Sequence, residues 1–158
     1  MKAYALGLYE KAMPSTLSWR EKLETAKEAG YDYVELSIDD SEEKIGRLDM
    51  PKEERLELVK TMYEVGIPIR TMCVSALTKY SMGNDKPEYE ARGMEILKKS
   101  IRFADDIGVR VVMIPGYDVY YEPSTVETKR RYLKNLKIGA ETAEREGFPE
   151  LAARFRMV

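Results

Sequence analysis

The fold of this chain is decided by the stretch Val109-Arg-Val-Val-Met-Ile-Pro-Gly-Tyr-Asp-Val-Tyr-Tyr121. The run from Val111 to Ile114 follows Gly108, is apolar on both faces and is rich in β-branched residues, which is typical of a buried parallel strand. It stops at Pro115-Gly116, and polar and aromatic side chains follow. Because parallel α/β folds bind ligands at the carboxyl ends of their strands, we predict a core strand with a site-lining loop. A core strand followed by a merely aromatic loop is the alternative.

Working outward, the same unit of a strand and a glycine-terminated helix repeats along the chain. Glycines at positions 30, 66, 108 and 147 end four predicted helices and are spaced by 36, 42 and 39 residues. Ser18 with Glu21, and Ser124 with Glu127, are predicted capping boxes, and Pro51 is placed to open a helix. The predicted strands cover residues 3–9, 31–38, 67–75 and 109–114, and the predicted helices cover 18–30, 51–66, 88–107 and 124–147.

This alternation predicts an α/β fold with a parallel sheet and right-handed crossovers, either an open doubly wound sheet or a piece of a barrel. The turn after the first strand, Glu10 to Pro14, has no glycine, which disfavours a nucleotide-binding open sheet. A complete barrel takes about 250 residues, and this chain has 158. We therefore predict a parallel (βα)4 half of a TIM-type barrel over residues 1–147. Residues 148–158 are predicted to be an irregular tail that replaces the expected fifth strand.

The composition excludes several classes of function. The net charge of −2 gives no basic field for nucleic acid, and no apolar stretch reaches the roughly 20 residues that span a bilayer. A single cysteine, Cys73, excludes an internal disulfide and fits a cytoplasmic protein; we expect it to be a buried core thiol. Histidine is absent, so any acid–base or metal chemistry must use other side chains.

Four motifs, spread in order over the four units, resemble one family. They are Gly7-Leu-Tyr-Glu-Lys-Ala12, Tyr33-Val-Glu-Leu-Ser37, Met72-Cys-Val-Ser-Ala76 and Gly116-Tyr-Asp-Val-Tyr-Tyr121. Together they resemble the amino-terminal half of the L-ribulose/L-xylulose 5-phosphate 3-epimerases, which belong to the xylose-isomerase-like barrel superfamily. The resemblance covers residues 4 to about 147 and implies a sugar-phosphate epimerase, an isomerase of carbohydrate metabolism.

The resemblance also implies that the chemistry lies outside this chain. In the family, two glutamates and a divalent metal of the Mn or Mg class come from strands five to eight, so we expect no metal site or cofactor here. Leu77 stands where family members carry histidine, and leucine cannot hydrogen-bond a sugar hydroxyl. We expect the chain alone to be inactive, as the product of a frameshift or premature stop, or as a deliberately cut half-barrel.

Candidate site residues lie after the predicted strands, where barrels keep their sites. For each, an ordinary structural or solvated role is the alternative, and Asp39 to Glu43 are read as a solvated acidic loop rather than a metal cluster. The substrate-lining candidates are Glu10, Lys11, Glu35, Lys79, Tyr117, Asp118 and Tyr120.

Two further hypotheses do not require catalysis. A four-stranded parallel sheet curved for a barrel leaves two open edges, which invite pairing and predict a homo-oligomer. Such an assembly could be a closed barrel of two copies or a swapped dimer with a flavodoxin-like sheet. The chain could instead bind a small sugar phosphate without turning it over. A DNA-repair role like that of endonuclease IV is disfavoured, because it needs histidine ligands and a basic groove.

Overall fold

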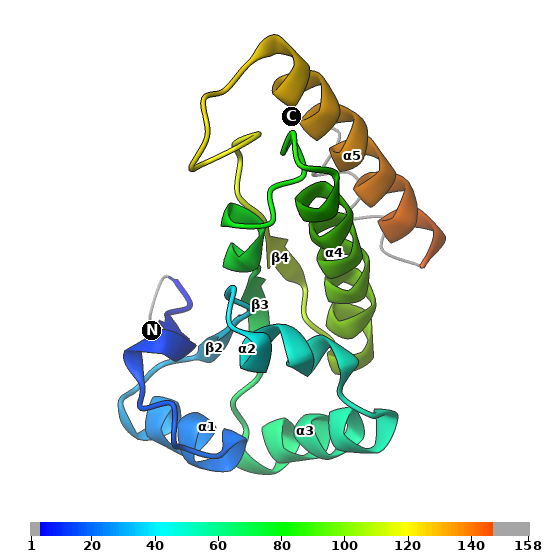
Figure 1. The fold of residues 1–158 in the computed structure, drawn as a ribbon. Coiled ribbons are helices and arrows are strands. Elements are labelled where there is room, and N and C mark those ends of the chain that lie inside the picture. The colour runs from blue at the N-terminus through cyan, green and yellow to red at the C-terminus, as the bar shows by residue number, and fades with distance from the viewer. Residues whose placement is uncertain (1–3, 147–158) are drawn as a thin grey trace.

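The structure, a computed structural model, describes residues 4–146 and confirms the repeated strand–helix unit (Figure 1). Within that range, no helix is both long and apolar enough to cross a bilayer. The predicted tail, residues 148–158, lies outside the described residues. The strands are β1 (Gly7–Tyr9), β2 (Tyr33–Ser37), β3 (Ile69–Cys73) and β4 (Val111–Met113). The α-helices are α1 (Trp19–Glu28), α2 (Glu42–Gly46), α3 (Lys52–Val65), α4 (Pro87–Ile107) and α5 (Val126–Arg145), with 3₁₀ turns η1 (Glu10–Ala12), η2 (Arg47–Asp49) and η3 (Ser75–Thr78).

The sheet has the strand order β1-β2-β3-β4, and every neighbouring pair is parallel. A doubly wound sheet reverses its strand order at a switch point, and this sheet does not. The alternative of an open nucleotide-binding or flavodoxin-like sheet is therefore wrong for the single chain. The sequential order is that of half a TIM-type barrel, which confirms the predicted fold class.

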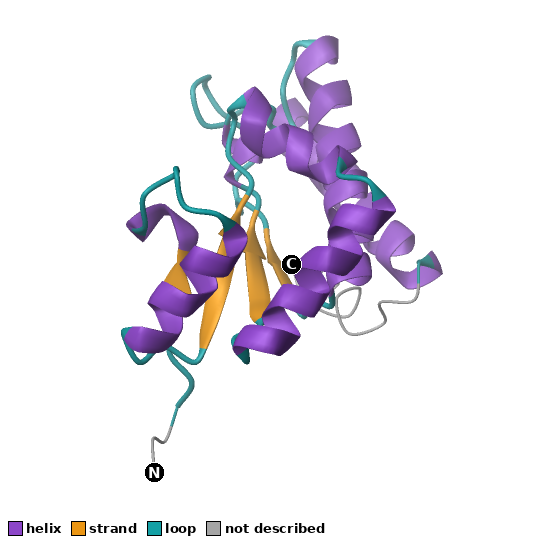
Figure 2. Ribbon diagram, turned by 90° about the horizontal axis from the view of Figure 1, so that it is seen from below, coloured by secondary structure: helices purple, strands orange, loops and turns teal. Residues whose placement is uncertain are grey.

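One face of the sheet is packed and the other is open. Val34, Leu36, Met72 and Val112 are buried on the packed face. On the other face, Tyr33 and Glu35 of β2 and Thr71 and Cys73 of β3 are only partly covered. The helices form a layer on the packed face, with α1 against α3, α3 against α4 and α4 against α5. Figure 2 shows the strands side by side with these helices packed along them.

The predicted helix ends are largely confirmed. Gly66 and Gly108 end α3 and α4 with φ of 79° and 74°, a left-handed conformation that glycine adopts without a steric penalty. Ser18 caps α1, and Glu21 completes the capping box. Gly147 lies outside the described residues.

Other local predictions were wrong. The strands are shorter than predicted, and the acidic stretch is not all loop, because Ser41 caps the short helix α2. The capping box of α5 uses Thr125 and Thr128 instead of Ser124 and Glu127. Ser124 instead donates its hydroxyl to Asp118, at 3.0 and 2.8 Å from the two carboxylate oxygens. Ser124 is thus engaged by Asp118, and the adjacent Thr125 caps α5.

Candidate functional site

The open face of the sheet carries a row of mostly polar side chains that runs from the middle of the strands to their carboxyl ends. We call it the inner face and define it by Tyr9, Glu35, Thr71, Cys73 and Met113, which the parallel register aligns on one side. Thr71 Oγ1 donates a hydrogen bond of 2.8 Å to Glu35. All five side chains are only partly covered or exposed. The inner face therefore offers a carboxylate and hydroxyl groups to a ligand.

Tyr9 and Cys73 are neutral hydrogen-bonding groups on this face. Burial raises the pKa of both side chains above the ordinary value, and Tyr9 shares a hydrogen bond of 3.2 Å with Ser37. Cys73 is partly exposed rather than a core thiol, so that prediction was wrong. Its raised pKa keeps the thiol protonated at neutral pH, so it is not an activated nucleophile.

Directly after β1 lies a buried charge cluster, which we define as Glu10, Lys22, Lys44 and Arg47. The Glu10 side chain is 1% exposed and lies 2.8 Å from Lys22 Nζ, 2.6 Å from Lys44 Nζ and 2.8 Å from Arg47. The backbone N–H of Ser37 donates to the same carboxylate at 2.9 Å. Burial alone would raise the pKa of Glu10, but the hydrogen bonds from Lys22, Lys44 and Ser37 outweigh it and lower this pKa to about 2.

A cavity of about 280 Å³ opens beside the charge cluster. Lys11 Nζ lies 2.8 Å from Asp39 at its wall. Burial opposes ionisation of Asp39, but hydrogen bonds from Lys11 and Ser41 lower its pKa to about 2. Lys11 is therefore an ion-pair partner at the end of β2. The cavity is lined by Glu10, Lys11, Met13, Ser15, Lys22, Asp39 and Lys44.

The remaining candidates lie on the loops after β3 and β4. Tyr117 shares a hydrogen bond of 2.6 Å with Thr78, and its ring centre lies 5.1 Å from that of Tyr120, which is 59% exposed. Asp118 is buried and accepts hydrogen bonds from Ser124 and Thr128, so it fixes the loop to the start of α5. Burial opposes ionisation of Asp118, but these hydroxyls lower its pKa.

Lys79 is partly exposed on its loop, 3.7 Å from Asp40. Leu77, the residue at the family's histidine position, is 2% exposed and packs in the core. The structure therefore brings Glu10 and Lys11 to one cavity and Tyr117 and Tyr120 to one aromatic cluster. Glu35 lies on the inner face, where it is hydrogen-bonded to Thr71.

Sequence reasoning missed the partners of these residues. Lys44 and Arg47 were not considered because α2 and η2 were not predicted, and Thr71 was not considered beside Glu35. Simple alternation along β3 could not have found Thr71, because the register between β2 and β3 shifts here: buried Ile69 pairs with Val34, and Thr71 pairs with Glu35.

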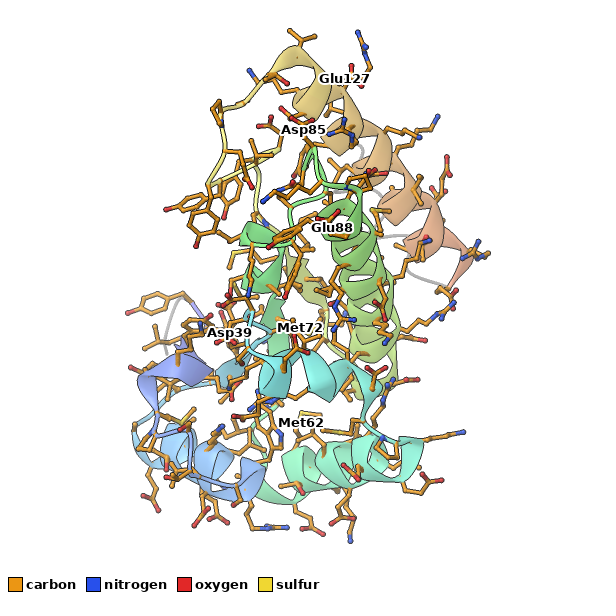
Figure 3. The ribbon with its side chains drawn as sticks, viewed as in Figure 1. Asp39, Met62, Met72, Asp85, Glu88 and Glu127 are labelled. Carbon is orange, nitrogen blue, oxygen red and sulfur yellow. The ribbon has the colours of Figure 1, made fainter. Side chains whose placement is uncertain are left out.

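The described residues do not fit a metal ion. Within residues 4–146, no three histidine, cysteine, aspartate or glutamate side chains lie close enough together to hold one. Figure 3 shows how widely the acidic side chains are spread, with Asp39 far from Asp85 and Glu127. No chemical step through a metal follows from residues 4–146.

Residues 23–152 match the xylose isomerase-like TIM barrel family. The chain belongs to this family. Family membership agrees with the parallel sheet and with the position of the polar row at the carboxyl ends of its strands.

Among curated proteins, the chain is 43% identical over 144 residues to L-ribulose-5-phosphate 3-epimerase UlaE from Escherichia coli O139:H28 and from Shigella sonnei. Each match covers 91% of this chain and 51% of the relative. The chain therefore spans about half the length of the curated relatives it matches.

Solved structures give the same picture of the fold. A structure of L-ribulose 3-epimerase superposes with a TM-score of 0.66 at 24% identity, covering 91% of this chain and 48% of that one. A D-psicose 3-epimerase crystallised in the presence of D-fructose superposes with a TM-score of 0.72 at 13% identity, covering 91% and 50%. At these identities the likeness concerns the fold alone.

Proposed function

We propose that this chain supplies the amino-terminal half-barrel of a sugar-phosphate 3-epimerase for substrates of the L-ribulose 5-phosphate and L-xylulose 5-phosphate class. The observation that carries the proposal is the 43% identity to UlaE over 91% of the chain. The polar inner face at the carboxyl ends of the strands supports it, because barrel enzymes bind their substrates there.

In this proposal the chain binds and orients the sugar but does not move the proton at C3. Glu35 and Thr71 face the open side and can accept and donate hydrogen bonds to sugar hydroxyls. Glu10 is not available as a base, because five hydrogen bonds hold its carboxylate. A complementary half-barrel would then supply the proton-transfer groups and any divalent metal of the Mn or Mg class.

The test is exchange of the C3 proton of L-ribulose 5-phosphate for deuterium, with added Mn²⁺. The purified chain alone should give the background rate, and mixing it with the carboxyl-terminal half of an E. coli UlaE should restore exchange. Exchange by the chain alone would contradict the proposal. So would a mixture that co-purifies as a complex and stays inactive.

A matched pair of variants locates the contribution of the inner face. Glu35→Gln should raise the KM of the reconstituted barrel, because it removes the charge that binds sugar hydroxyls. Glu57→Gln, on the exposed surface of α3, is the control and should leave KM unchanged. If both variants behave like the unaltered chain, the inner face does not bind the substrate.

A second candidate function is binding of a sugar phosphate without turnover by the chain alone. The half-exposed Glu35–Thr71 pair on the inner face favours it, since both side chains are accessible to a ligand in the single chain. Isothermal titration with L-xylulose 5-phosphate should release heat that Glu35→Gln abolishes. An absence of heat with the unaltered chain would exclude this candidate and leave the half-barrel proposal standing.

A further inference from the structure

The two edge strands of the sheet are alike in direction and length. β1 and β4 each have three residues and run parallel to each other, because every pair in the order β1-β2-β3-β4 is parallel. β1 pairs with β2, and β4 pairs with β3. Within residues 4–146, no strand pairs with the outer side of either edge strand, so its backbone groups can extend the sheet.

A two-fold axis parallel to the strands would leave the strand direction unchanged in the second copy. It would place β4 of each copy beside β1 of the other, in parallel, and we call these two strand contacts the seams. The product contains the eight parallel strands of a closed barrel. A two-fold assembly closes on itself and leaves no free edge for further growth.

Exposed apolar side chains lie beside both edges of the sheet. Met113 is 48% exposed on the inner face beside the β4 edge, and Leu6 and Tyr4, next to the β1 edge, are 43% and 69% exposed. Apolar side chains thus flank both edges that closure would join. Exposed apolar surface of this kind is typical of association sites.

From these features we infer that the inner face is a self-association surface, and that a second copy of this chain closes it into a two-fold half-barrel dimer. Glu35 of the second copy then faces the same interior as Glu35 of the first. The enclosed site would contain two carboxylates on opposite walls, each held by its own Thr71. This inference does not rest on the proposed epimerase function, because it requires no substrate. The second copy occupies the face that a complementary half would otherwise close, so the two assemblies compete for one surface.

The first test is the mass of the purified chain by sedimentation equilibrium, over about 1 to 100 µM, where moderate self-affinity is visible. The expected mass at high concentration is twice the 18.2 kDa of one chain. The single cysteine provides an independent measurement, because Cys73 lies on the inner face. Its alkylation rate should fall as the dimer forms. A chain that stays monomeric, with a constant alkylation rate, would overturn the inference.

Two variants identify the surface that associates. Met113→Lys would bury an unpaired charge at the seam and should weaken the dimer at least about tenfold. Leu133→Lys is its matched control, because Leu133 is 52% exposed but lies on α5, and it should leave the dimer unchanged. Equal effects, or a dimer that survives Met113→Lys, would mean that another surface associates.

Glu35→Gln tests the carboxylate pair specifically. It keeps an acceptor for Thr71 while removing like charges from opposite walls of the interior, so it should tighten the dimer by about two- to tenfold. Unchanged or weaker association would show that the two Glu35 side chains do not share one interior.

Discussion

Two glutamates, one directly after β1 and one in the middle of β2, have opposite environments. Glu10, at the end of β1, is 1% exposed and accepts hydrogen bonds from three cationic side chains and a backbone N–H. Glu35, on neighbouring β2, is partly exposed and accepts a hydrogen bond from Thr71. Glu10 ties β1 and β2 to α1 and α2, whereas Glu35 faces the open side of the sheet.

The difference separates a carboxylate that stabilises the fold from one that is free to meet a ligand. A buried charge is tolerated only when it is paired and hydrogen-bonded, and removing one partner leaves the others uncompensated. A partly exposed carboxylate with one hydrogen bond carries no such penalty. We therefore expect changes at Glu10 to affect stability and changes at Glu35 to affect binding.

The largest effect is expected from Glu10→Gln. It leaves Lys22, Lys44 and Arg47 around a neutral amide, and breaking a buried ion pair in this way typically costs about 3 to 5 kcal/mol. Urea unfolding followed by circular dichroism measures the loss. Glu35→Gln is the matched control on the next strand and should cost less than about 1 kcal/mol. Equal losses at the two positions would remove the distinction between them.

The second effect is a loss of stability in acid that depends on Glu10. Its pKa falls from 4.5 in the unfolded reference to about 2 in the folded chain, so between these values the unfolded chain binds more protons. The stability from this group is complete above about pH 5 and is lost as the pH falls toward 2, which amounts to about 3 kcal/mol. Asp39 acts in the same direction.

The measurement is the unfolding free energy of the unaltered chain and of Glu10→Gln at several pH values from 7 to 3. The two curves should converge as the pH falls, because acid neutralises the carboxylate that the substitution removes. A constant gap would mean that Glu10 keeps an ordinary pKa in the folded chain.

The third effect extends the comparison from the two carboxylates to two glycines, one in α4 and one in β1. A Cβ at Gly93, on α4, would collide with the backbone carbonyl oxygen of Tyr80, whereas one at Gly7 would collide with the Tyr33 ring. The backbone cannot move aside, so Gly93→Ala should cost about 1 to 3 kcal/mol. Gly7→Ala should cost less, because the Tyr33 ring can rotate toward the open inner face. Thermal unfolding of both variants tests this order, and a larger loss for Gly7→Ala would contradict it.

The spacing of apolar residues and the positions of glycine and proline were enough to predict the fold. Glycines such as Gly66 and Gly108, after amphipathic stretches, placed the helix ends, and the apolar run before Pro115 placed β4. These signals are local, and the physics behind them acts over a few residues. The short helix α2 escaped prediction because five residues are too few to show a period.

The site was less predictable because its contacts are not local. Glu10 meets Lys44 and Arg47 across 34 and 37 residues of sequence, and no spacing rule anticipates that convergence. The sequence left open which way Glu35 points, since a shift of one residue exchanges the two faces of a strand. Only the pairing with Thr71 and the uncovered face of the sheet assign it to the inner side.

The smallest effect is expected from Thr71→Val, which removes the hydrogen bond to Glu35 while keeping the shape of the side chain. Because Glu35 is partly exposed, water can replace the lost donor, and the expected cost is about 0.5 to 1 kcal/mol. Binding should change more than stability, since Glu35 is then free to rotate and is no longer held toward a ligand. The paired measurement is thermal unfolding and titration with L-xylulose 5-phosphate. A loss of stability as large as that of Glu10→Gln would mean that the inner face also supports the fold, and the contrast between the two glutamates would fail.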